Sequence, residues 1–231
     1  MRVLAFDTST AACTVALFDG ARWVERSEHA GASHSQRLLP IVRELLAEAG
    51  IALRALDGIA FGAGPGSFTG LRIACGVAQG LALGTGLPLL AVVSLEALAQ
   101  AAHAQHGWTR VACALDARMR EVYFAAYERE GGSWRARVEP CVLPPSEAPV
   151  LEGRWFGAGN GFAAYAALGE RLAGGLAERD ERALPTAIAI GTLALPRLEA
   201  GEGVPAREAA PLYVRHRVAL TAVERDSGQR L

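Results

Sequence analysis

Lysine is absent from the 231-residue chain, and all 23 basic residues are arginine. This absence excludes three kinds of site that need a lysine amine: a P-loop, a Schiff base and a Ser–Lys dyad. Cysteine is scarce as well, with four residues and no C-x-x-C pair. We therefore expect buried thiols of a reducing compartment rather than disulfides or a metal-binding cluster.

Net charge and long apolar runs are also lacking. The formal net charge is -1, so nothing draws the whole molecule to nucleic acid or to an anionic membrane. No apolar run approaches the length of about 18 residues that predicts a membrane span. The first apolar segment meets Asp7, which argues against a signal peptide. These absences predict a cytoplasmic protein.

The stretch Gly62–Leu83 joins a glycine-rich turn to a helical pattern (GAGPGSFTGLRIACGVAQGLAL). A short apolar run at 56–61 precedes it, so the predicted order is strand, turn, helix. Such a turn can direct backbone N–H groups and a helix N-terminus at a phosphate. It can equally be a tight turn that requires positive φ. The sequence leaves both interpretations open.

Ser67 lies in this turn but does not have the context of a nucleophile. The motif G-x-S-x-G needs glycine two residues to either side, and here those positions hold Pro65 and Thr69. We expect Ser67 or Thr69 to be the helix N-cap instead.

The helix that follows has glycine at every fourth position: Gly76, Gly80 and Gly84. These residues share one face. Each glycine costs about 0.8–1 kcal/mol relative to alanine inside a helix. We therefore expect another backbone, of a sheet or a second helix, to lie against this stripe. A separate stripe of small apolar residues includes Leu71 and Ala74, so the helix has two packing faces.

Two segments, 2–29 and 110–139, have the same organisation of three strands that form a hairpin meander. Asp7 and Asp116 follow the first strand of each. This duplication predicts an α/β chain of two tandem actin/Hsp70/hexokinase-like (ribonuclease H-like) domains, each a mixed sheet flanked by helices. We place the domains at residues 1–104 and 105–231 and expect that the tail can pack back.

Six segments resemble one known family: LAFDTSTAACTVALFDG, HSQRLLP, GPGSFTGLRIACGVAQGLA, VSLEALA, DARMREVYFAAY and PLYVR. They are similar to the bacterial TsaB (YeaZ) family over nearly the whole chain, and residues 64–72 (GPGSFTGLR) are the most specific part. The resemblance implies a subunit of the machinery that adds a threonylcarbamoyl group to N6 of adenosine 37, in tRNAs that read codons beginning with A.

The resemblance further implies a non-catalytic role. In this family the transferase is the related subunit TsaD, and TsaE is an accessory ATPase. TsaB binds and supports TsaD, and in isolation it forms a homodimer through the same face. This chain would then interact with TsaE and with tRNA only indirectly, as part of the complex.

A nucleotide site of the actin-like superfamily needs glycine beside both aspartate turns, so that the backbone can approach the phosphates. The turns here read DTST at 7–10 and DARM at 116–119, without glycine. We expect the side chains of Ala117, Arg118 and Met119 to occupy the phosphate space, with no cofactor bound. The vestigial nucleotide pocket would comprise Asp7, Ser9, Thr10, Asp116, Gly157 and Gly159. Asp7 is then a turn-capping residue rather than a ligand of magnesium-bound water. The alternative is an ATP-dependent small-molecule kinase or ATPase of the same superfamily.

No metal site is expected. The resemblance implies that TsaD holds its metal with two histidines, four residues apart, after a Gly-Leu-Pro-Leu segment. The corresponding positions here hold Ser94 and Leu98, and leucine cannot ligate a metal. The chain also lacks H-E-x-x-H, which argues against a peptidase.

Binding to a partner is the function that remains. The helices at 35–49 and 69–83 can lie side by side and present an apolar face, and two such pairs would form a four-helix contact. The predicted partner-binding residues are Leu38, Leu39, Val42, Leu45, Leu46, Leu71, Arg72, Ala74, Gly76, Val77 and Gly80. The alternative is that these stripes only cover their own sheet. The basic cluster at 215–217 could contact phosphate or be a solvated tail.

Overall fold

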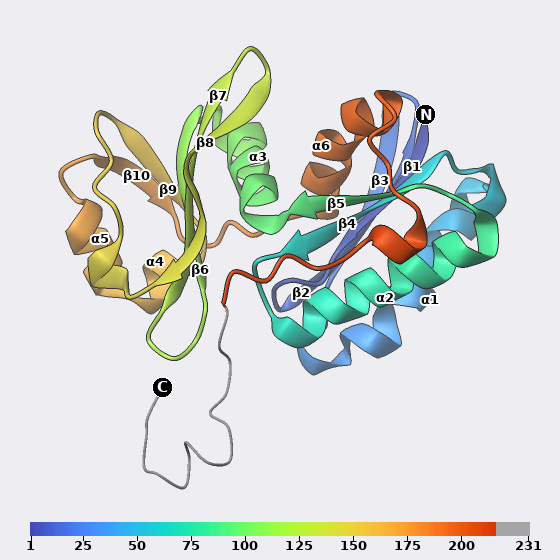
Figure 1. Cartoon of the computed structure of the whole chain (residues 1–231), viewed down its shortest axis with the longest axis horizontal. Coiled ribbons are helices and arrows are strands. Elements are labelled where there is room, and N and C mark those ends of the chain that lie inside the picture. The colour runs from blue at the N-terminus through green and yellow to red at the C-terminus, as the bar shows by residue number, and fades with distance from the viewer. Residues whose placement is uncertain (216–231) are drawn as a thin grey trace, which may run out of the picture.

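The computed structural model describes residues 1–215 and contains two five-stranded mixed sheets (Figure 1). The first sheet has the order β3-β2-β1-β4-β5. Its strands are β1 (Arg2–Asp7), β2 (Ala12–Asp19), β3 (Arg22–His29), β4 (Gly58–Gly64) and β5 (Leu89–Val93). The first three form an antiparallel meander, whereas β4 and β5 join parallel to β1.

The second sheet repeats this arrangement, with the order β10-β9-β6-β7-β8. Its strands are β6 (Arg110–Asp116), β7 (Val122–Glu130), β8 (Ser133–Leu143), β9 (Trp155–Ala158) and β10 (Leu176–Asp180). Numbered within each half, both sheets have the strand order 3-2-1-4-5 with the same directions. The predicted duplication and the actin-like (ribonuclease H-like) fold class are confirmed.

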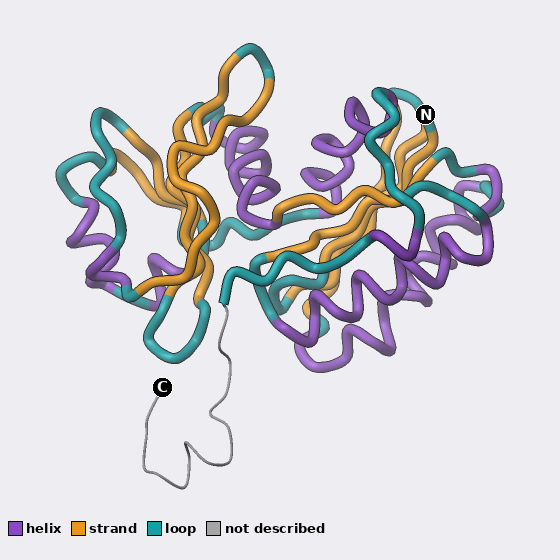
Figure 2. Tube along the Cα trace, in the orientation of Figure 1, coloured by secondary structure: helices purple, strands orange, loops and turns teal. Residues whose placement is uncertain are grey.

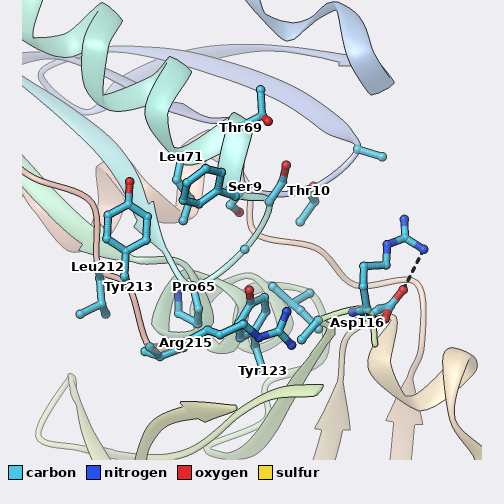
Figure 3. Close-up of a pocket in the computed structure, with 18 of the residues that line it drawn as sticks. Ser9, Thr10, Pro65, Thr69, Leu71, Asp116, Tyr123, Leu212, Tyr213 and Arg215 are labelled. Carbon is cyan, nitrogen blue, oxygen red and sulfur yellow. Dashed lines mark hydrogen bonds and ion pairs between the residues drawn. The ribbon is translucent and has the colours of Figure 1, made fainter. Parts of the chain in front are cut away.

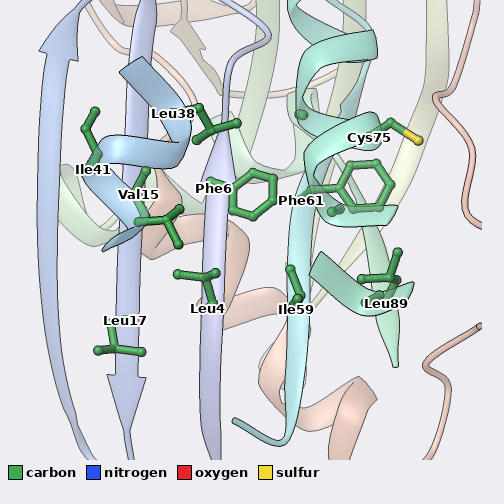
Figure 4. Close-up of a cluster of buried hydrophobic side chains, with 14 of the residues drawn as sticks. Leu4, Phe6, Val15, Leu17, Leu38, Ile41, Ile59, Phe61, Cys75 and Leu89 are labelled. Atoms are coloured by element: carbon green, nitrogen blue, oxygen red, sulfur yellow. The ribbon is translucent and has the colours of Figure 1, made fainter. Parts of the chain in front are cut away.

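Helices cover both faces of each sheet (Figure 2). On the first sheet, α1 (His34–Ala49) and α2 (Phe68–Thr85) lie on one face and α6 (Ala187–Glu199) on the other. Because side chains alternate across a strand, Leu4 and Phe6 point toward α1 and α2 (Figure 4), whereas Val3 and Ala5 meet α6.

The second sheet packs on α3 (Ser94–His106) and, on its other face, on α4 (Gly161–Ala164) and α5 (Ala166–Leu172). A division at residue 104 assigns α3 to the first domain, but most of its buried face belongs to the second core. Conversely, α6 belongs to the first core. The first sheet therefore packs against α6, which lies in the predicted second domain, and the second sheet packs against α3, which lies mostly in the predicted first domain.

The described chain ends by packing back over the first sheet. Residue Val204 forms a bridge with Leu89, and the N–H of Leu212 donates to the carbonyl of Ala63 at the end of β4 (2.7 Å). This segment then reaches the second half at Arg215, which pairs with Glu121. It places C-terminal residues between the two halves.

The helical segment after β9 is interrupted at Tyr165, whose backbone is extended and whose hydroxyl donates to Asp116 Oδ1 (2.9 Å). Strand β8 continues to Leu143, and the segment Leu176–Asp180 forms β10 at the edge of the sheet. Within residues 1–215, no helix has both the length and the apolar character needed to cross a bilayer.

Candidate functional site

A cleft of about 880 Å³ lies between the two halves of the molecule (Figure 3). Most of its lining comes from the loop after β1, the start of α2, the turn after β6 and residues 212–215, and further lining residues are Gly31, His34, Tyr123 and Asn160. Among the residues of the predicted vestigial pocket, Ser9, Thr10 and Asp116 face this space. The loop after Asp7 and the turn at Asp116 face each other across this space.

Asp7 does not face the cleft, because it is completely buried. Its Oδ1 accepts hydrogen bonds from the N–H (2.9 Å) and the hydroxyl (2.8 Å) of Ser9, and the Ser94 hydroxyl lies 3.4 Å from Oδ2. Burial raises the pKa of Asp7 to about 6, although these hydrogen bonds oppose the shift. A Cβ added at Gly62 would lie 1.8 Å from Oδ2, so only glycine fits at this position of β4 beside the carboxylate. The geometry is that of the turn-capping residue predicted from the sequence.

The glycine-rich turn packs against this aspartate loop. The N–H of Ser67 donates to the carbonyl of Ser9 (2.7 Å), and the Thr8 hydroxyl donates to the carbonyl of Gly70 (2.7 Å). A Cβ at Gly70 would lie 1.8 Å from the Thr8 carbonyl oxygen. The glycines therefore permit the glycine-rich turn to approach the aspartate loop closely. The side chain of Ser67 accepts from the N–H of Gly70, which confirms the predicted N-cap.

The second aspartate turn has an unusual backbone. Arg118, Met119 and Arg120 have φ values of 61°, 54° and 61°, in the left-handed region that non-glycine residues seldom adopt. The turn is held through Asp116, which accepts from the N–H of Arg118 (2.8 Å) and pairs with its guanidinium (3.1 Å). Ala117 and Arg118 line the cleft as predicted, whereas Met119 does not and is exposed to solvent.

The prediction was wrong for Gly157 and Gly159, which do not line the cleft. A Cβ at Gly159 would lie 2.1 Å from the carbonyl oxygen of Ala114, and one at Gly157 would lie 3.0 Å from the Phe162 ring. Both glycines serve packing inside the second half. The neighbouring Asn160, which was not predicted, lines the cleft instead and accepts from the N–H of Asp116 (3.0 Å).

Residues that could hold a metal ion or act as a thiol nucleophile are not gathered at this cleft. The part of the chain described here has no cluster of three histidine, cysteine or acidic residues. The Ser94 hydroxyl accepts from the N–H of Gly64 (3.1 Å), and Leu98 is buried in the core. The four cysteines are free, and burial raises the pKa of each thiol.

The predicted partner-binding residues divide into two groups. Six of them are buried, so the structure does not support a partner contact through their side chains and the prediction was wrong for these: Leu38, Val42, Leu45, Leu46 and Ala74 in the core on the first sheet, and Leu71 at the cleft. The others face outward. Leu39 on α1 is 42% exposed, Arg72, Gly76 and Gly80 on α2 are exposed, and Val77 is half-buried.

The glycine stripe of α2 is open to solvent. No atom lies within 4 Å of a Cβ added at Gly76, Gly80 or Gly84, so the close backbone expected for this stripe is not provided by residues 1–215. Leu83 follows the same stripe and is 76% exposed, the largest value among the exposed large apolar residues. It was not among the predicted residues, although its spacing of three from Gly80 placed it on this face. The possible phosphate-binding cluster at 215–217 lies, apart from Arg215, outside the described residues.

Comparisons with known proteins agree over nearly the whole chain. The model of the family described as TsaD, tRNA N6-adenosine threonylcarbamoyltransferase, matches residues 27–222. The tRNA threonylcarbamoyladenosine biosynthesis protein TsaB of Escherichia coli (strain K12) is 42% identical over 225 residues, which cover 95% of this chain and 96% of that protein. The protein of the same name from Haemophilus influenzae is 38% identical and covers 94% of this chain and 95% of its own length. The solved structure of YeaZ from Pseudomonas aeruginosa has a TM-score of 0.86 and 47% identity, over 92% of this chain and 99% of that one.

Proposed function

Since the chain belongs to the TsaB (YeaZ) family of tRNA threonylcarbamoyladenosine biosynthesis proteins, we propose that it is the non-catalytic subunit of the complex that makes this modification. In this proposal it binds and supports the TsaD transferase, which modifies adenosine 37 of tRNAs that read codons beginning with A. TsaE interacts with this chain indirectly, as part of the complex.

The observation that supports docking most strongly is the outward face of α1 and α2. It combines a stripe of exposed glycines with exposed apolar side chains, among them Leu39 and Leu83. Mid-helix glycine lowers helix stability, and within the described chain these glycines have no packing role that offsets the cost. A helix of another subunit, lying close against the stripe, would give them one. We call Leu39, Gly76, Val77, Gly80 and Leu83 the docking face.

The absence of catalysis is the second part of the proposal. Asp7 is sealed beneath the glycine turn, and hydrogen bonds within the chain occupy the donor of Ser67 and the acceptor of Gly70. These features favour a supporting role over the phosphoryl transfer of the wider superfamily, which needs an accessible magnesium site.

The docking face would also pair two copies of the chain when TsaD is absent. Light scattering coupled to gel filtration tests this directly. We expect the chain alone to be a dimer that TsaD converts to a heterodimer, because both partners use one face. A ternary species that contains two copies of the chain and retains the original homodimer contact would contradict the shared face.

A further inference from the structure

Two aromatic rings form an exposed platform at the mouth of the cleft. Phe68, at the start of α2, and Tyr213, on the C-terminal segment, are 43% and 44% exposed, and their ring centroids lie 5.8 Å apart with the ring planes inclined by 41°. The guanidinium of Arg72 lies 3.8 Å from the Phe68 centroid and donates to the Tyr213 hydroxyl (3.1 Å). The two rings are thus fixed in place while part of their surface stays open to solvent.

The lining of the cleft is basic, although the chain has a formal net charge of -1. Arg72, Arg118 and Arg215 line it, and Asp116 is the one carboxylate among the lining residues; Arg118 pairs with Asp116 and Arg215 with Glu121, which leaves Arg72 without a carboxylate partner among the ion pairs found in residues 1–215. The side chain of Arg118 is 86% exposed, and it belongs to the left-handed turn that lines the same cleft as Phe68 and Tyr213. The ligand that this charge favours is an anion.

A free nucleoside triphosphate does not match these groups. Its phosphates need a magnesium site, a lysine or a row of unpaired backbone donors. Asp7 is buried, the chain has no lysine, and the residues from Met1 to Arg215 include no metal-holding cluster. Exposed aromatic faces next to scattered arginines are instead the features that bind single-stranded nucleic acid, in which each base brings a single phosphate.

We propose that the mouth of the cleft binds an unpaired nucleotide of RNA. The base stacks on the exposed ring of Tyr213, beside Phe68, and a neighbouring phosphate pairs with Arg118. This inference rests on the proposed function, because the complex of that function acts on a tRNA. It replaces the expectation that this chain interacts with tRNA only indirectly, as part of the complex.

The test measures RNA binding by the full chain in its complex with the transferase. The probe is a fluorescein-labelled transcript of a tRNA that reads a codon beginning with A, followed by anisotropy over a series of salt concentrations. The variant is Arg118→Glu/Tyr213→Ala, which leaves Arg72 intact because that residue borders the docking face. Arg22→Glu/Trp23→Ala is the matched control. It changes an exposed arginine and an exposed aromatic residue at the start of β3, and neither residue lines the cleft.

Loss of one stacked base predicts an affinity at least about fivefold weaker for the variant. Loss of one phosphate contact predicts a slope of log K against log salt that is smaller by about 0.7. The control, and Tyr213→Phe, which keeps the ring, should bind like the wild type. Thermal unfolding and gel filtration verify that each variant is folded and in complex.

Three results would overturn the inference: an unchanged affinity of the variant, displacement of the RNA by millimolar AMP or ATP, or loss of the transferase from the variant complex. The second would identify a free nucleotide as the ligand, and the third a protein interface. The proposed function has a separate readout, namely whether the wild-type chain supports transfer, so either proposal can fail alone.

Discussion

Gly80→Leu separates docking from folding because the structure predicts opposite effects on the two. Gly80 is exposed in the middle of α2, and nothing lies within 4 Å of the added Cβ. Leucine is a far better helix former than glycine, so the variant should gain about 0.8 kcal/mol in the free energy of unfolding. For a chain of this size that corresponds to a rise of about 2–3 °C in the unfolding midpoint.

The same side chain should weaken association. If a partner helix lies against the glycine stripe, leucine overfills the contact at a cost of about 1–3 kcal/mol, which weakens the affinity for TsaD by roughly 5- to 150-fold. Calorimetry measures both quantities, by titration with TsaD and by scanning of the variant alone. Ala167→Leu, on the exposed face of α5 in the second half, is the control for adding a large side chain. An unchanged affinity for TsaD would refute the docking face, and a lower unfolding midpoint would show that Gly80 is packed within its own chain.

Three further predictions concern stability. Leu38→Ala should lower the free energy of unfolding by about 2–5 kcal/mol, because Leu38 is fully buried. Leu39→Ala should leave the free energy of unfolding nearly unchanged and weaken only the binding of TsaD, because Leu39 is exposed. Denaturant titration and a TsaD-binding assay compare the two variants. On α2, Gly70→Ala should lower the free energy of unfolding by more than about 1 kcal/mol, because the new Cβ would lie 1.8 Å from a carbonyl oxygen. Gly76→Ala should raise the free energy of unfolding by about 0.8–1 kcal/mol, because nothing lies near its new Cβ. Thermal scans in which both variants shift the unfolding midpoint in the same direction would contradict the packing described. Burial raises the pKa of Asp7 to about 6 in the folded chain. Between about pH 4 and pH 6 the folded chain therefore binds a proton at Asp7 that the unfolded chain has lost, so the free energy of unfolding falls as the pH rises through this window. Asp7→Asn should reduce this loss, by up to about 3 kcal/mol, in urea titrations at pH 4 and pH 7; equal pH dependence in both proteins would show that Asp7 does not titrate there.

The fold could be predicted because local signals agreed with the tertiary structure. The hairpin turn at Asp19-Gly20, the alternating strands around it and the apolar face of α1 each have a local cause. Strand β10 lacks such a cause: its sequence, LAERD, is polar, and it forms by pairing with β9. The break at Tyr165 is also tertiary in origin, since the hydroxyl bonds to Asp116, 49 residues away.

The docking face was harder to predict than the fold. Helical spacing identifies which residues share a face, but it does not say which face meets the sheet. In α1 the leucines chosen from the sequence were largely the inward ones, because the strongest periodic signal belongs to the core. The outward residues are few and scattered, and Leu39 and Leu83 become informative only when their exposure is known. Tyr213 likewise reaches the cleft through a segment that packs back over the first sheet, which no local pattern indicates.

The most direct test of the proposed role is the rate of threonylcarbamoyl transfer to tRNA in a reconstituted system with TsaD, TsaE and the synthase that supplies the activated carbamoyl group. We predict that omitting this chain abolishes transfer, that the wild-type chain restores it, and that Gly80→Leu restores it only at concentrations high enough to overcome the weakened docking. Full transfer without the chain, or ATP hydrolysis by the chain in isolation, would contradict a subunit that works by docking alone.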